Sequence, residues 1–135
     1  MSEKIKALKI IHLGICCASI ITYCVIGYLY IGRLNITNIP ADSLIYIALP
    51  VLALIISNVI FNIINRNAKA GMTIDESFAI YQSASITRWA ILEGTAFLIL
   101  FLIPEIVLFG IIIICYLVFL RPGEDNFQKE LQRFD

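Results

Sequence analysis

The amino-acid sequence predicts an all-α integral membrane protein, a four-helix bundle with both termini in the cytoplasm, on three observations. First, hydrophobic residues make up 60% of the 135 residues and charged residues only 15%, whereas an ordinary soluble domain is about 45–50% apolar and about 25% charged. Second, the apolar residues come in blocks of roughly twenty, the length that a helix needs to cross a bilayer. Third, nearly all basic residues fall on one side of these blocks.

We predict one membrane domain that takes in the whole chain. Its four spans lie at about residues 10–30, 43–64, 83–103 and 105–120. The first span could instead be a signal peptide, but its apolar stretch is longer than the roughly 7–15 residues of such a peptide and ends in aromatic residues rather than in a cleavage site. In the second span, Pro50 is expected to bend the helix toward its outer end.

The start of the third span carries a helix-capping signal. Thr73 followed by Glu76 has the capping-box form, so we expect one helix to begin here and to continue through the span. Ile74, Phe78 and Tyr81 are at helical spacing, which predicts an amphipathic first section that lies at the level of the lipid headgroups. Pro104-Glu105 then predicts a tight outer turn before the fourth span.

The chain after Pro122-Gly123 predicts a short tail helix at about residues 125–134. Asp125 is its expected cap, and Phe127, Leu131 and Phe134 fall on one face. Two interpretations are open for this helix. It could rest on the membrane surface as an interfacial foot, or it could bind a cytoplasmic partner.

The distribution of basic residues predicts the orientation. Of ten Lys and Arg residues, Arg33 alone falls on the outer side. The other nine fall together on the opposite side: Lys4, Lys6, Lys9, Arg66, Lys69, Arg88, Arg121, Lys129 and Arg133. Because basic residues are enriched in cytoplasmic segments, both termini are predicted to be cytoplasmic, in a multi-pass protein of the bacterial cytoplasmic (inner) membrane.

Glu93 is the candidate for chemistry inside the membrane. A carboxylate within a span costs several kcal/mol unless it is neutral, paired or facing a polar cavity, so Glu93 is either a proton or cation site or a protonated structural residue that bonds to another helix. Arg88 is not expected to pair with it, because five helical residues place the two about 140° apart. Arg88 is expected to extend to the cytoplasmic headgroups, whereas Gln82, eleven residues before Glu93, shares its face.

Other polar residues are expected at the depth of Glu93. Asn58, Asn62 and Asn65 recur on one face of the second span, and His12 lies about one turn into the first span. These residues predict a cytoplasm-facing polar pocket shared with Glu93. The alternative is that each one separately satisfies local backbone or lipid headgroups.

Small residues and cysteines also occur within the predicted spans. Gly14 with Ala18, and Ala90 with Gly94, have the spacing that allows close helix crossing, which predicts that the first and third spans pack together there. The cysteines all fall within spans and are expected to be small buried hydrophobic residues. They are Cys16, Cys17, Cys24 and Cys115.

Several function classes do not fit the sequence. Ten basic and ten acidic residues give no net charge, which leaves no basic field for nucleic acid. A single histidine cannot supply both ligands of a bis-histidine haem, and neither a glycine-rich phosphate loop nor a zinc-protease pattern is present. We therefore expect no cofactor, no metal and no enzymatic activity.

The segment of residues 81–97, YQSASITRWAILEGTAF, resembles a family of small four-helix inner-membrane proteins of Bacteroidota-type bacteria. That family has no known activity, so the resemblance implies an architecture and no chemistry. Ala90 to Glu93 also resembles the carboxylate helix of rotary ATPase proteolipid subunits, but those proteins have a glycine-rich preceding span and residues 43–64 contain no glycine. Small multidrug-resistance transporters are similar in architecture only, since their membrane glutamate lies in the first helix.

From these observations we expect a non-enzymatic accessory or interaction subunit of a membrane assembly. Its expected partners are the lipid bilayer and either another membrane protein or further copies of the chain. The alternative is a small proton- or cation-coupled transporter that uses Glu93.

Overall fold

The computed structural model describes residues 2–31 and 40–134, in which the chain is helical and contains no strand. In chain order, with η for a 3-10 helix, the elements are α1 (Ser2–Ile31), η1 (Ala41–Ile47), α2 (Ala48–Asn65), α3 (Ile74–Leu102), η2 (Pro104–Ile106), α4 (Val107–Phe119) and α5 (Glu124–Phe134). The prediction of an all-α fold is therefore confirmed. Arg33 lies outside the described residues, as do the side chains of Arg133 and Phe134.

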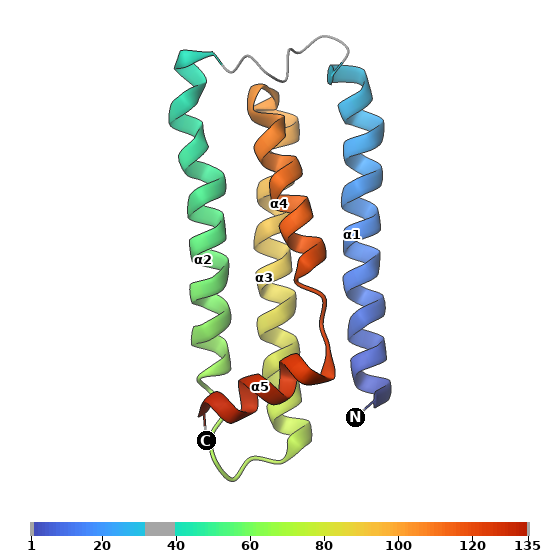
Figure 1. The fold of residues 1–135 in the computed structure, drawn as a ribbon, viewed down its shortest axis with the longest axis vertical. Helices are drawn as coiled ribbons and strands as arrows, with labels where there is room; N and C mark the ends of the chain where they lie inside the picture. The colour runs from blue at the N-terminus through green and yellow to red at the C-terminus, as the bar shows by residue number, and fades with distance from the viewer. Residues whose placement is uncertain (1, 32–39, 135) are drawn as a thin grey trace.

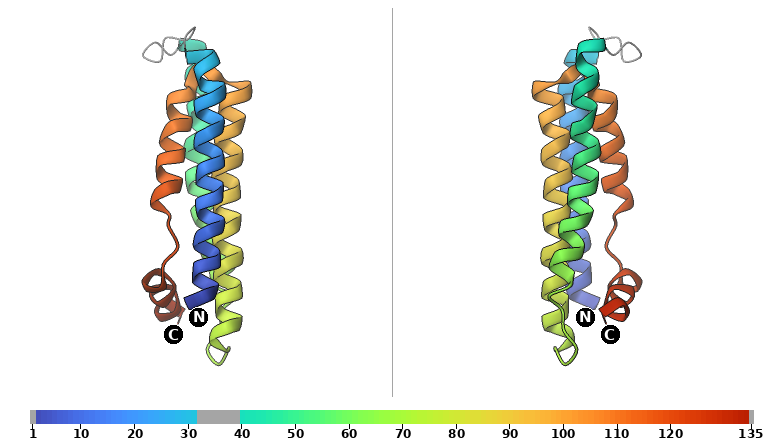
Figure 2. Two further views of the ribbon diagram at one scale, coloured as in Figure 1. Left: turned by 90° about the vertical axis from the view of Figure 1, so that its right-hand side faces the viewer. Right: turned by 90° about the vertical axis from the view of Figure 1, so that its left-hand side faces the viewer.

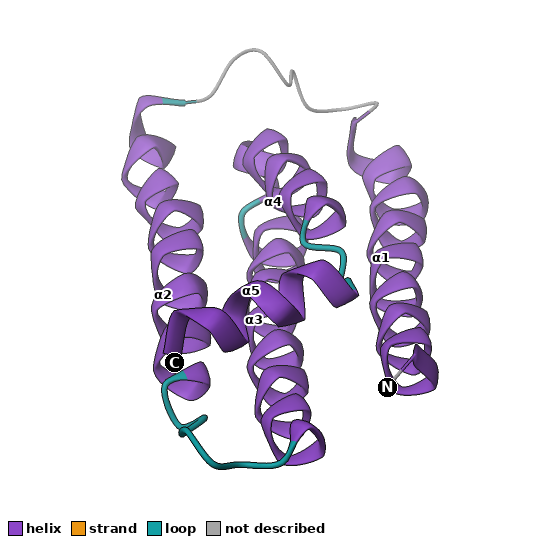
Figure 3. Ribbon diagram, turned by 60° about the horizontal axis from the view of Figure 1, so that its bottom comes forward, coloured by secondary structure: helices purple, strands orange, loops and turns teal. Residues whose placement is uncertain are grey.

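Helices α1 to α4 lie side by side, and successive helices run in opposite directions (Figure 1). α3 packs against α1, α2 and α4, and the side views show α3 and α4 on opposite sides of the bundle (Figure 2). Both termini lie at one end of the molecule, together with the loop of residues 66–73, and we call this the terminal end. α5 lies across the terminal end at a steep angle to the other helices (Figure 3).

Three helical segments are long and apolar enough to cross a membrane, namely Ser2–Gly27, Ala41–Asn65 and Ile74–Leu102. The fourth predicted span is shorter. Its 3 residues of η2 and 13 residues of α4 reach about 24 Å at 1.5 Å per residue, and they qualify only together with α5, from which they are bent by 84°. The described residues therefore contain three such helices, or four if this bent pair is one span.

The interior is apolar around α3, and so is much of the outer surface. Trp89 and Leu92 are fully buried at the centre. On the outside, Ile10 and Leu102 are each 70% exposed and Phe119 is 85% exposed. Exposed apolar surface on this scale is unfavourable in water and favourable in hydrocarbon, which agrees with a membrane protein.

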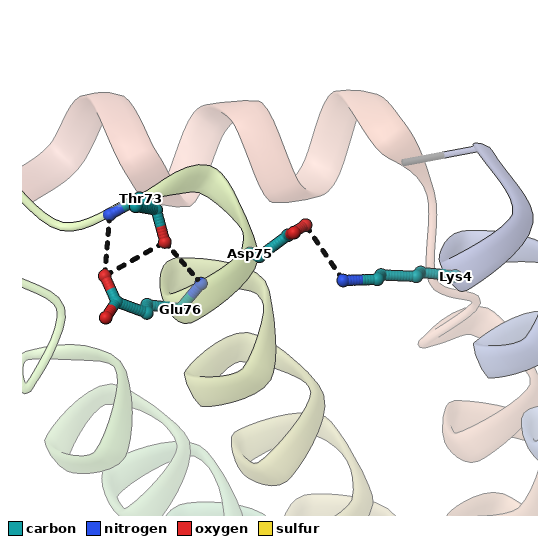
Figure 4. Close-up of polar contacts among 4 residues, drawn as sticks. All are labelled: Lys4, Thr73, Asp75 and Glu76. Atoms are coloured by element: carbon teal, nitrogen blue, oxygen red, sulfur yellow. Dashed lines mark hydrogen bonds and ion pairs between the residues drawn. The ribbon is translucent and has the colours of Figure 1, made fainter.

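The beginning of α3 follows the capping prediction. The Thr73 backbone N–H donates to Glu76 Oε2 at 2.8 Å, and the Glu76 N–H donates to Thr73 Oγ1 at 3.3 Å (Figure 4). Beside this cap, Lys4 Nζ lies 2.9 Å from Asp75 Oδ1. The ion pair is exposed and therefore weak, but it joins the first turn of α1 to the first turn of α3.

Two other helix starts differ from the prediction. α1 begins at Ser2 rather than near residue 10, because the lysine-rich segment before the span is made of good helix formers. In the second span, η1 changes to α-helix at Ala48, two residues before Pro50. Pro50 lacks the N–H that an α-helical bond to Tyr46 would need, so the break falls at the outer end as expected.

The tail helix begins one residue earlier than predicted, and its expected cap was wrong. The Phe127 N–H donates to the Gly123 carbonyl at 3.1 Å, so Asp125 lies in the first turn rather than at the cap. Phe127 is 3% exposed, and its ring centroid lies 5.3 Å from those of both Phe78 and Tyr81. Phe127, on the apolar face of α5, thus packs against α3.

The same contact corrects the prediction for the start of α3. Phe78 and Tyr81 are 2% and 5% exposed, and they contact α5 instead of lipid headgroups. Ile74, the third residue of the predicted amphipathic face, is 62% exposed. The physical reason is that α5 folds back over this part of α3 and supplies a protein surface where the sequence pattern indicated lipid.

Candidate functional site

Glu93 is half-buried at the contact between α1 and α3. Its Oε1 lies 3.2 Å from the hydroxyl of Ser19, which is fully buried and which also lies 2.9 Å from the carbonyl of Ile15. A hydroxyl carries one hydrogen. The Ser19 hydroxyl therefore donates to the Ile15 carbonyl or to Glu93 Oε1, or shares its one hydrogen between the two acceptors.

Asn58 joins α2 to α4. Its Nδ2 donates to the Leu54 carbonyl at 2.8 Å and to the hydroxyl of Tyr116 at 3.0 Å, while that hydroxyl lies 3.2 Å from Asn58 Oδ1. In membranes an interhelical bond of this kind contributes about 0.6 kcal/mol on average. Asn58 therefore links α2 to α4 by hydrogen bonds.

His12 joins α1 to α4. The ring is buried, and its Nε2 lies 2.8 Å from the Leu117 carbonyl. Because a carbonyl only accepts, Nε2 carries the hydrogen in this bond. The ring also lies against Trp89, with 4.7 Å between centroids, and Cys16 Sγ is 3.6 Å from Nε2. The imidazole thus contacts α3 and α4 as well as Cys16 of its own helix.

These polar residues do not form the shared pocket that the sequence predicted. Glu93 bonds between α1 and α3, Asn58 between α2 and α4, and His12 between α1 and α4. Asn62 and Gln82 are half-buried. Residues at a similar predicted depth therefore lie at different helix interfaces, since depth alone does not say toward which neighbouring helix a side chain points.

Asn65, the last residue of the predicted stripe, lies at the terminal end. It is 3% exposed, and among the described residues its Nδ2 has no hydrogen-bond partner. The side chain lines a cavity of about 200 Å³ beneath the loop of residues 66–73. It is therefore separate from both Asn58 and Glu93.

Arg88 packs against α2, a contact that the sequence analysis did not predict, and its extension to the lipid headgroups stays a prediction. Its Cζ lies 3.8 Å above the ring of Phe61 in α2, in a cation–π contact. The prediction that Arg88 and Glu93 do not pair agrees with this placement, because Glu93 bonds to Ser19 on another side of α3. Arg88 instead lines a second cavity, of about 290 Å³, under α5.

The small residues lie on the outer surface, which corrects the packing prediction. Gly14 and Ala18 in α1 are exposed, and so are Ala90 and Gly94 in α3. A Cβ added to either glycine would meet nothing within 4 Å. α1 and α3 do pack together, but through other residues, with contacts such as that of Ser19 with Glu93.

The cysteines also differ from the prediction. Cys16 is buried, whereas Cys17, Cys24 and Cys115 are exposed on the outside of the helices. In the described part of the chain, no three His, Cys, Asp or Glu side chains are grouped so that they could hold a metal ion.

Four of the described residues that the sequence analysis missed also take part in interhelical contacts. Ser19 lies seven residues after His12, so the heptad spacing of polar residues along α1 could have indicated it. The hydroxyl of Tyr23 donates to the Ala96 carbonyl. Gly110 lies against that hydroxyl, and Tyr116 bonds to Asn58. The pattern carried no signal for the last three, because each depends on an approach between distant segments.

No family model, curated protein or solved structure matches the chain. The resemblance of residues 81–97 to small inner-membrane proteins therefore stays a prediction. Function is argued from the contacts within this molecule.

Proposed function

We propose that the chain is a four-span protein of the bacterial cytoplasmic membrane, with both termini in the cytoplasm, and that it acts as a non-enzymatic accessory or interaction subunit of a membrane assembly. The observation that carries this proposal is the use of the interior polar side chains. Glu93, Asn58 and His12 each bond to a neighbouring helix of the same chain. These bonds stabilise the packing of the helices. The outer helix faces are therefore the surface available for binding a partner.

The outer faces of α1 and α3 support association with another membrane helix. Gly14 and Ala18, and Ala90 and Gly94, expose small-xxx-small pairs to the surroundings. Such pairs let two backbones approach closely in lipid, where van der Waals packing drives association. The proposed occupant is a helix of a partner membrane protein or of a second copy of the chain.

Gly94→Ile tests this surface. The added side chain would hold a partner helix away, so we expect the complex extracted in mild detergent to be lost, while the amount of protein in the membrane stays the same. Blue native gels of the extracted membranes measure the complex.

Cys115→Ile is the matched control, since it adds bulk at a small exposed residue of α4. It should leave the complex intact. A complex that survives Gly94→Ile, or a wild-type protein that migrates as a monomer, would contradict the proposal.

The orientation is tested by cysteine labelling after the native cysteines are replaced by serine. Asp42 is exposed in η1, directly before α2, and Asn67 follows the end of α2, so the two residues lie at opposite ends of that helix. With cytoplasmic termini, Asp42→Cys should react with a membrane-impermeant maleimide in intact cells, and Asn67→Cys only after permeabilisation. The reverse pattern would invert the topology.

A small proton- or cation-coupled transporter is the second candidate. The observation in its favour is a half-buried carboxyl group, Glu93, inside a helix that is long and apolar enough to cross the membrane. Against it, the Glu93 carboxyl group is bonded to Ser19 of the same chain. Glu93→Gln separates the two functions, because glutamine keeps the hydrogen bond and cannot release a proton.

A further inference from the structure

The cavity of about 290 Å³ under α5 concentrates positive charge. Among the described residues that line it are Arg88, Arg121 and Lys129, against one carboxylate, Glu130. The cations come from three segments: α3, the connection after α4, and α5. The cavity is therefore a product of the fold and not of one basic stretch of sequence.

Arg88 is the most informative of these residues. Its guanidinium is held against the Phe61 ring, and its Nε is buried with no hydrogen-bond partner in the described part of the chain. A buried donor without an acceptor is unfavourable by about 1–3 kcal/mol. Oxygen atoms of a phosphate group are suitable acceptors for a guanidinium.

The connection between α4 and α5 fixes the other side of the cavity. Asn126 Nδ2 donates to the carbonyl of Arg121 at 3.2 Å, which holds the turn that carries Arg121. Arg121 and Lys129 are themselves exposed, so their head groups are accessible to a ligand.

The lining of the cavity also has an apolar part. Phe119, which is 85% exposed, and Leu120 lie beside the cations at the end of α4. A soluble phosphate would make no apolar contact with this surface, whereas the acyl chains of a phospholipid would lie against it. Basic pockets between helices on the cytoplasmic side are typical binding sites for anionic lipid headgroups.

We propose that this cavity binds the phosphate group of an anionic phospholipid of the inner leaflet. Arg121 and Lys129 hold the phosphate, Arg88 lies behind them, and the acyl chains run along Phe119. The assignment to the inner leaflet rests on the proposed membrane orientation.

The test is a lipid titration of the purified full-length protein in neutral detergent, followed by native mass spectrometry. Dioleoylphosphatidylglycerol and dioleoylphosphatidylcholine are the two probes. We expect the wild type to prefer phosphatidylglycerol, and Arg121→Gln with Lys129→Gln to reduce that preference by about tenfold or more, since two charge-assisted contacts are lost.

Arg66→Gln with Lys69→Gln is the matched control. It removes the same charge from exposed residues at the same end of the molecule, outside this cavity, and should retain the preference. Circular dichroism and gel filtration establish that both double variants are folded. The charge-retaining variant Arg121→Lys with Lys129→Arg should bind phosphatidylglycerol like the wild type.

Three outcomes would overturn the proposal: no preference in the wild type, equal losses in the two double variants, or displacement of phosphatidylglycerol by sn-glycerol 3-phosphate at a similar concentration. The last would identify a soluble phosphate as the ligand. Because binding in micelles does not depend on topology, these outcomes leave the orientation untouched. Inverted cysteine labelling would instead overturn the orientation and the leaflet.

Discussion

Gly110→Ala should destabilise the protein by about 1–3 kcal/mol, the usual penalty for overpacking a closed interior. Gly110 lies on α4 where three helices meet, and a Cβ built there would overlap the hydroxyl of Tyr23 and lie 2.9 Å from its Cζ. The Tyr23 side chain is buried and donates to the Ala96 carbonyl of α3, so it cannot move aside without losing that bond. Alanine is the better helix former by about 1 kcal/mol, but the steric penalty outweighs this gain.

Gly94→Ala is the matched control, because the same change on the outside of α3 would meet nothing within 4 Å. It should be neutral or slightly stabilising. Thermal unfolding in mild detergent measures both variants. In a Tyr23→Phe background the Gly110 substitution should be less harmful, since the overlapping hydroxyl is gone; purely additive losses, or equal effects at the two glycines, would contradict the contact.

The helices and their order could be predicted because the signals for them are local. Apolar blocks of sufficient length, the pair Thr73 and Glu76, and the turn at Pro104 each act within a few residues. The position of α5 could not be predicted in this way. Its Phe127 covers Phe78 and Tyr81, which lie about fifty residues earlier in the chain, and only the folded molecule brings them together.

The candidate site shows the same limit. Helical periodicity gave the angle between Arg88 and Glu93 around α3. Periodicity did not predict whether Arg88 or Glu93 points toward α2, because that depends on where the neighbouring helices lie. Arg88 contacts Phe61, and the small-residue pairs that were expected between α1 and α3 lie on the outer surface. Periodicity describes one helix at a time, whereas a site requires several.

Residue 93 should show the sharpest contrast between two substitutions. Glu93→Gln keeps the shape and hydrogen-bonding ability of a neutral acid and removes only the capacity to release a proton. For an interaction subunit we expect Glu93→Gln to preserve both the amount of protein in the membrane and its ability to complement deletion of the gene. Glu93→Leu removes the contact with Ser19, and we expect it to lower stability by about 1 kcal/mol.

The partner in this bond is Ser19, which was not among the residues of the predicted polar pocket. Ser19→Ala should therefore lower the additional cost of Glu93→Leu, whereas Asn58→Leu should leave that cost unchanged, because Asn58 bonds to Tyr116 instead. Complementation and membrane protein level, measured together, decide between the functions. A Glu93→Gln protein that is folded, present at the wild-type level and unable to complement would favour the ion-coupled carrier over the interaction subunit, because glutamine cannot release a proton.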